Sequence, residues 1–172
     1  MRLPIQSNIF VAALIAMSLI GWSVASGQQE KKMLPDVDHP RHMLLTPADI
    51  EWVDGPASLP PGAKFAVIEG DLSKPEPITF RLKLPGDYKA APHWHPGVEH
   101  VTVISGTLYL GAGDQLDPAK ATELPAGSFA VFPVNRAMWG WTKGETVVQV
   151  HSIGPWGISY VNPADDPRKE AQ

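Results

Sequence analysis

Two histidines and a glutamate stand close together near the middle of the chain, in the segment HWHPGVE at residues 93–99. In an extended backbone the side chains alternate between two faces, so His93 and His95 share one face. Glu99 returns to that face if the Pro-Gly pair between them makes a bend. Two imidazoles and one carboxylate form a facial ligand set that leaves coordination positions open for a substrate or for oxygen. We therefore predict a divalent metal site at these three residues.

Two further side chains are candidates for a fourth ligand. Met138 carries a thioether, a soft donor that favours Cu(I), although methionine usually packs in cores. His151 ends a predicted strand with one buried and one exposed face, so its ring could serve either as a ligand or as a structural group. The sequence leaves these alternatives open for both residues.

Trp139 and Trp141 stand two positions apart beside Met138. We predict that this pair lines the mouth of the pocket, where it would suit an apolar or aromatic small-molecule ligand. Packing in the core or against a second subunit is the alternative interpretation.

The elements that must position these residues are short strands. Residues 78–84 alternate apolar with polar side chains, which is typical of a half-buried strand. Further strands are predicted at 65–69, 98–104, 107–110, 128–132, 146–151 and 157–161, with single helical turns at 46–49 and within 114–121. The 18 prolines and 15 glycines that separate them favour a sandwich or barrel. We predict one all-β domain over residues 51–162.

The first 25 residues are predicted to be a cleavable signal peptide. Ile9 to Trp22 is an apolar run of 14 residues, shorter than a membrane span, and Ala25 ends a stretch of small residues suited to cleavage. An uncleaved anchor is the alternative. We expect a periplasmic or secreted protein that has no membrane association after cleavage, with residues 26–50 as a polar N-terminal arm and residues 163–172 as a polar tail.

Composition limits the function further. The chain has 172 residues, of which 44% are hydrophobic, enough for a packed core. Its net charge is −4 and no basic stripe is present, so nucleic acid is not an expected partner. The chain contains no cysteine, which excludes disulfides, thiolate zinc sites and thiol nucleophiles.

The spacing His-x-His-x3-Glu-x6-Gly, which ends at Gly106, closely resembles the first motif of the cupin superfamily. Gly86 stands for the glycine that opens this motif, one residue farther from His93 than usual. The resemblance covers roughly residues 60–155, and the part from the first histidine to Gly106 fits fully.

The second cupin motif is matched only in part. Gly127 and Pro133 fit, and Asn135 stands where the family has a glycine, a tolerable exchange because asparagine also adopts left-handed backbone conformations. Met138 takes the place of the third histidine, and Thr142 that of an asparagine. The fourth metal ligand of the family pattern is therefore missing.

The resemblance implies a double-stranded β-helix, the cupin or jelly-roll barrel, with a metal inside it and pairing into a homodimer. Three ligands and water suit divalent Fe, Mn, Ni or Zn, with Cu less favoured. Cupins include dioxygenases, isomerases and non-catalytic binders, so the fold leaves the reaction open. One hypothesis is a metal-dependent oxidoreductase or isomerase acting on a small molecule. The alternative is a non-catalytic protein that binds a metal or a small ligand. The sequence assigns no catalytic residue.

Overall fold

The computed structural model describes residues 42–169. The predicted signal peptide and most of the predicted arm lie outside them. The described strands are β1 Val53–Asp54, β2 Lys64–Glu69, β3 Pro77–Leu84, β4 Lys89–Trp94, β5 Glu99–Ser105, β6 Thr107–Ala112, β7 Thr122–Pro125, β8 Phe129–Phe132, β9 Met138–Thr142, β10 Thr146–Ile153 and β11 Ser159–Tyr160. Single 3₁₀ turns are η1 Pro47–Asp49, η2 Pro118–Lys120, η3 Pro163–Asp165 and η4 Pro167–Lys169. Within the described range, no helix has the length and apolar character needed to cross a bilayer.

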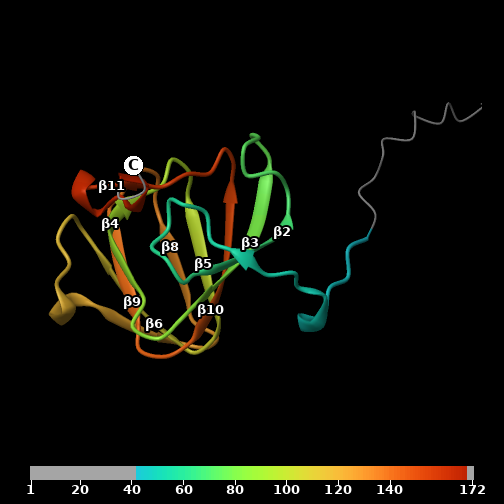
Figure 1. Ribbon diagram of the computed structural model, residues 1–172, viewed down its shortest axis with the longest axis horizontal. Coiled ribbons are helices and arrows are strands. Elements are labelled where there is room, and N and C mark those ends of the chain that lie inside the picture. Colours follow the sequence, from blue (N-terminus) through green and yellow to red (C-terminus); the bar gives the residue numbers. More distant parts are fainter. Residues whose placement is uncertain (1–41, 170–172) are drawn as a thin grey trace, which may run out of the picture. The chain divides into compact units, whose positions relative to one another are not determined.

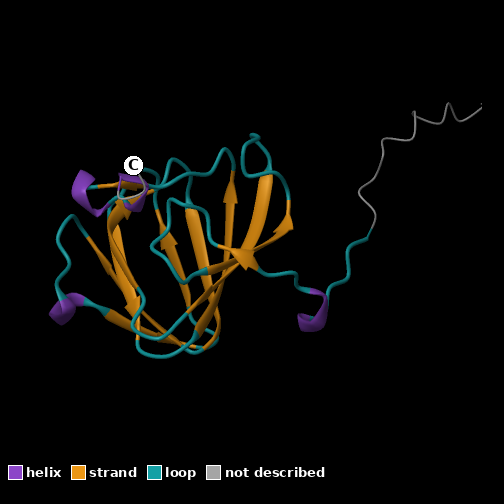
Figure 2. Ribbon diagram, in the orientation of Figure 1, coloured by secondary structure: helices purple, strands orange, loops and turns teal. Residues whose placement is uncertain are grey.

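The strands form two antiparallel sheets that face each other (Figures 1 and 2). One sheet has the order β1-β2-β3-β10-β5-β8, and the other has the order β11-β4-β9-β6-β7. From β3 to β11 the chain crosses to the opposite sheet at every connection except the β6–β7 hairpin. This winding is the predicted double-stranded β-helix, and it confirms the all-β class.

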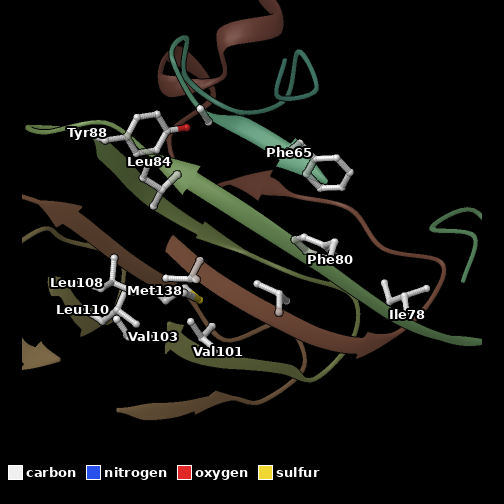
Figure 3. Close-up of a cluster of buried hydrophobic side chains, with 13 residues drawn as sticks. Phe65, Ile78, Phe80, Leu84, Tyr88, Val101, Val103, Leu108, Leu110 and Met138 are labelled. Atoms are coloured by element: carbon white, nitrogen blue, oxygen red, sulfur yellow. The ribbon is translucent and has the colours of Figure 1, made fainter. Parts of the chain in front are cut away.

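The core lies between the two sheets. Along β10 every second residue is buried, from Thr146 to Ser152, as expected for a strand with one face toward the interior. Phe80 and Val101 from the six-stranded sheet and Leu110 from the other sheet belong to one apolar cluster (Figure 3). Removal of this apolar surface from water is the main force that holds the sheets together.

The predicted strands and helical turns are confirmed to within two residues. The predicted turn at 46–49 has the expected capping box, in which the Thr46 N–H donates to the Asp49 carboxylate at 2.7 Å. The strands β1, β4, β7 and β9 were not predicted as strands. In β9 the first three residues are all buried, so no alternation of polar and apolar residues was available to reveal it.

Gly106, which closes the first motif, is required by the turn between β5 and β6. Its φ is +78°, and a Cβ at this position would overlap the backbone oxygen of Glu145. We expect Gly106→Ala to lower the free energy of unfolding by about 2 kcal/mol. Urea denaturation measures the change.

Gly144→Ala is the matched control, because a Cβ at Gly144 meets no atom within 4 Å in the described structure. We expect this neighbouring substitution to be nearly neutral. Equal losses in the two variants would show that Gly106 carries no special backbone requirement.

Candidate metal centre

The three predicted ligands come together where the chain passes from one sheet to the other. His93 lies in β4, His95 follows the end of that strand, and Glu99 opens β5. The intervening Pro-Gly segment reverses the chain, which returns Glu99 toward the two histidines. Each of the three residues is only 5% exposed, and all three line the same interior cavity. The predicted set therefore faces inward rather than toward bulk water.

Backbone carbonyls fix the orientation of both imidazoles. Nδ1 of His93 lies 2.7 Å from the oxygen of Ala91, and Nδ1 of His95 lies 2.7 Å from the oxygen of Gly157. A carbonyl can only accept a hydrogen bond, so each Nδ1 carries the proton and each Nε2 keeps its lone pair. This anchoring of the ring nitrogen away from the ion is typical of metal-ligating histidines.

Burial sets the charge of the centre. It raises the pKa of Glu99 to about 7 and lowers the pKa of His93 to about 4; the pKa of His95 is lowered as well, chiefly by burial. The imidazoles are therefore neutral near pH 7. Nε2 of His95 and Oε1 of Glu99 are 3.6 Å apart, which is too far for a hydrogen bond. Because the imidazole of His95 is neutral, this contact is not an ion pair.

One oxygen of the carboxyl group has no partner. Oε2 of Glu99 is buried and makes no hydrogen bond within the described structure. An unsatisfied buried acceptor is costly, and a bound cation would satisfy it. The donors thus fit a divalent ion in type, protonation and anchoring.

The spacing of the donors is more open than a metal cage requires. Across residues 42–169, no three His, Asp or Glu side chains form a group that could hold a metal ion as they stand. The ring centroids of His93 and His95 are 5.0 Å apart and their planes are nearly perpendicular. Binding a metal would therefore need the side chains to draw together.

The two candidates for a fourth ligand lie on different sides of the barrel. Met138 is 5% exposed, lines the cavity and is the register partner of His93 across β4 and β9. His151 faces away, since its β10 neighbours Val148 and Val150 are the residues that line the cavity. A role for His151 as a ligand of this centre is not compatible with its position.

His151 instead belongs to a polar row on the outer face of the six-stranded sheet. Its Nδ1 lies 3.0 Å from Oγ1 of Thr79, and its Nε2 lies 2.9 Å from Nε2 of Gln149. Because the amide nitrogen of Gln149 can only donate, Nε2 of His151 accepts and Nδ1 carries the proton. The ring therefore has two partners on this face.

The predicted tryptophan pair does not form the pocket wall as expected. The ring planes of Trp139 and Trp141 stack at an angle of 3° with centroids 6.0 Å apart, on the face of β9 opposite Met138. Trp141 borders the cavity, but Trp139 does not, and its ring packs over Gly111. Period-two alternation along β9 directs both tryptophans away from the face on which Met138 lines the cavity.

Trp156 is the cavity residue that sequence reasoning did not place. It lies between β10 and β11 and lines the cavity, where its ring stacks on His95 with centroids 4.8 Å apart and an angle of 21°. A single tryptophan in a connection between strands gives no periodic signal, so nothing in the local pattern could indicate its direction.

The cavity measures about 80 Å³ and has mainly apolar walls. This volume accommodates several water molecules or a small ligand, but it is below the range of pockets for drug-sized molecules. The turn after Pro133 contacts the backbone of His95: Asn135 has a φ of +56°, and its N–H donates to the oxygen of His95 at 3.0 Å. The left-handed conformation predicted for Asn135 is confirmed.

Neither a protein-family model nor a curated protein sequence matches the chain. Solved structures do. The polyketide cyclase RemF from Streptomyces resistomycificus is 14% identical, with a TM-score of 0.59 over 76% of this chain and 93% of its own. A protein proposed to be an acetylacetone dioxygenase, from Methylibium petroleiphilum PM1, is 15% identical, with a TM-score of 0.58 over 74% and 85%. An RmlC-like cupin from Shewanella frigidimarina is 12% identical, with a TM-score of 0.51 over 65% and 90%.

At these identities the likeness concerns the fold. The chain is a cupin in fold, a double-stranded β-helix with a small interior cavity.

Proposed function

We propose that the protein binds a divalent metal ion through His93, His95 and Glu99 and uses this centre to hold a small molecule in the cavity. One observation carries the proposal. Two carbonyl-anchored neutral imidazoles and a buried carboxyl oxygen without a partner lie in a cavity that is otherwise apolar. Keeping a partnerless carboxyl group in a core costs stability, which a bound cation would offset.

A divalent ion at this position would act as a Lewis acid on an oxygen atom of the ligand. The residues of the chain have separate roles around it. The two histidines would bind the ion, and the carboxylate of Glu99 would supply a negative charge that partly neutralises it. The apolar walls would exclude water, which strengthens electrostatic interactions inside the cavity.

An oxidoreductase or isomerase is the enzymatic form of this proposal. The likeness in fold to a polyketide cyclase and to a proposed acetylacetone dioxygenase supports it. Homodimer formation and export to the periplasm or beyond the cell remain part of the proposal.

The alternative is a non-catalytic binder of a metal or small ligand, which one observation favours. Among the cavity-lining residues in the described range, the only titratable side chain besides the three proposed ligands is Tyr88. Its hydroxyl donates to the oxygen of Pro60 at 3.0 Å, and burial raises its pKa further above the usual value. No free general base therefore remains beside the centre.

Elemental analysis of the purified protein, followed by calorimetric titration of the metal-free form with Mn²⁺, Fe²⁺, Ni²⁺ and Zn²⁺, tests the proposal. We expect one ion per chain. Turnover of a small oxygenated molecule by the loaded protein would favour the enzyme, and tight binding without turnover would favour the binder. Failure of all four ions to bind would contradict the metal centre, and with it both the enzyme and the metal binder.

Met138 provides a graded test of the same centre. We expect Met138→His to raise metal affinity by about tenfold or more, because it adds an imidazole opposite His93 in a position that already lines the cavity. Competition with a chromogenic chelator measures the change. Met138→Leu is the control, since it keeps the side-chain volume without a donor; a large loss in this variant would instead identify the thioether as a ligand.

A further inference from the structure

A short connection between β1 and β2 forms one wall of the cavity. This strap, residues 55–62, is the teal loop that leads into β2 in Figure 1. Leu59, near its centre, lines the cavity and packs against the apolar cluster, whereas Pro56, Ala57 and Pro61 are exposed. The strap is therefore a single layer of chain between the cavity and solvent.

Two buried phenols hold the strap from the inside. The hydroxyl of Tyr160 donates to the oxygen of Ser58 at 2.8 Å, and the hydroxyl of Tyr88 donates to the oxygen of Pro60 at 3.0 Å. Ser58 and Pro60 are the two neighbours of Leu59 in the chain. The two hydrogen bonds therefore fix the backbone on both sides of the leucine that lines the cavity.

The strap is also the cavity wall with the fewest attachments. Within the described range its backbone hydrogen bonds are internal or, from the N–H of Gly55 to the oxygen of Ala63 at 2.9 Å, join its own ends. Most other lining residues belong to strands that are paired in a sheet. The connection that contains Trp156 is fixed by its backbone, because the N–H of Trp156 donates to the oxygen of Leu72 at 2.7 Å.

One of the two phenols lies beside the candidate metal centre. Tyr160 is the register partner of His93 across β11 and β4, and the centroids of their rings are 5.9 Å apart. The three proposed ligands are each only 5% exposed to water, and a chelator or an organic ligand is far larger than water. We therefore expect such molecules to reach the centre when a wall of the cavity moves.

We propose that the strap is the gate of the cavity, that Leu59 closes it, and that the phenols of Tyr88 and Tyr160 hold it shut. Opening breaks two neutral hydrogen bonds and withdraws one leucine, while both sheets stay paired. The three prolines of the strap restrict its internal motion, so that it moves as a unit about its two ends. This inference rests on the proposed metal centre and adds the route by which the centre is reached.

Removal of Zn²⁺ by a chromogenic chelator tests the gate in the unmodified protein, so the test does not depend on any variant folding. Stopped-flow absorbance follows the reaction at increasing chelator concentration. We expect the removal rate to reach a plateau, because opening of the strap precedes contact between the chelator and the ion.

Replacing Tyr88 and Tyr160 together by phenylalanine removes both hydroxyls but keeps both rings. We expect the plateau rate to rise about 25-fold, which is about fivefold for each neutral hydrogen bond. The rate of Zn²⁺ uptake should rise by a similar factor. The affinity should change by less than about twofold, because the two bonds are lost equally from the loaded and the empty protein.

Tyr109→Phe is the matched control, because the Tyr109 ring stacks on Trp141 in the five-stranded sheet and does not hold the strap. Its rates should equal those of the unmodified protein. Leu59→Ala should accelerate both uptake and removal, since most of the side chain that closes the cavity is lost. Leu59→Met keeps the side-chain volume and should stay within about twofold of the unmodified rates.

The outcomes separate this inference from the proposed function. Three results would overturn the gate and leave the metal centre standing: a removal rate that rises in proportion to chelator concentration, unchanged rates in the double tyrosine variant, or faster removal without faster uptake. Absence of Zn²⁺ binding by the unmodified protein would overturn the proposed function and this inference with it.

Discussion

Replacing His93 and His95 together by alanine should lower the affinity for divalent metal ions by more than about 100-fold, because two of the three proposed ligands are lost. The remaining carboxyl group cannot hold an ion in competition with water. The fold should persist, since the histidines do not belong to the apolar cluster between the sheets. Calorimetric titration of metal-free protein measures the effect, and circular dichroism checks the fold.

His151→Ala is the matched control for this experiment. It also removes an imidazole, but from the outer face of the six-stranded sheet, where the ring contacts Thr79 and Gln149. We expect its metal affinity to equal that of the unmodified protein. An equal loss of affinity in both variants, or none in either, would show that the interior histidines are not the ligands.

Glu99→Gln should make the metal-free protein more stable above pH 7. In the folded protein burial raises the pKa of Glu99 to about 7, whereas in the unfolded chain the carboxyl group titrates near its model value of 4.5. Ionisation is therefore harder in the folded state, and the cost is fully present above pH 7 and absent below pH 4.5. We expect a gain in unfolding free energy on the order of 2 kcal/mol at pH 8, after allowance for the buried amide that replaces the carboxylate.

The pH dependence gives this prediction a second readout. The raised pKa of Glu99 makes stability fall between pH 4.5 and 7, whereas the lowered pKa of His93, about 4, makes it rise between pH 4 and 6.5. The two effects oppose each other in the unmodified protein. Glu99→Gln removes only the first, so its stability should climb more steeply up to pH 6.5 in urea denaturation.

Bound metal should make the unmodified protein more stable than Glu99→Gln, the reverse of the order expected without metal. The unmodified chain should gain stability from an added ion that binds only the folded state, while Glu99→Gln should gain much less. If the substitution destabilises the metal-free protein at pH 8, the carboxylate of Glu99 is already stabilised by a partner within the protein, and its proposed role as a metal ligand is contradicted. Glu99→Asp, which retains a carboxyl group on a shorter side chain, should keep the pH profile but bind metal weakly.

The sequence was sufficient to predict the strands that have one buried face. Residues 78–84 and 146–151 each have one face in the core and one outer face that carries polar side chains, so their pattern is visible without coordinates. The spacing of His93, His95 and Glu99 was also sufficient to predict that they face one interior space, because it depends only on local backbone geometry and one turn.

Features that depend on contacts across the barrel could not be predicted. Whether His151 points inward or outward depends on the register of β10 against its two neighbours, and a shift of one residue would reverse the answer. The direction of the Trp139 side chain likewise depends on the register of β9 against β4 and β6. Trp156 reaches the cavity from a connection, where no period constrains the side chain.

X-ray absorption spectroscopy on protein loaded with one equivalent of Zn²⁺ tests the central claim most directly, because it identifies the atoms around the ion. We predict scattering from two imidazole rings and from a small number of oxygen atoms at about 2.0–2.2 Å. The imidazole signal should vanish in the double histidine variant and persist in His151→Ala. A spectrum of oxygen ligands alone in the unmodified protein would contradict the account.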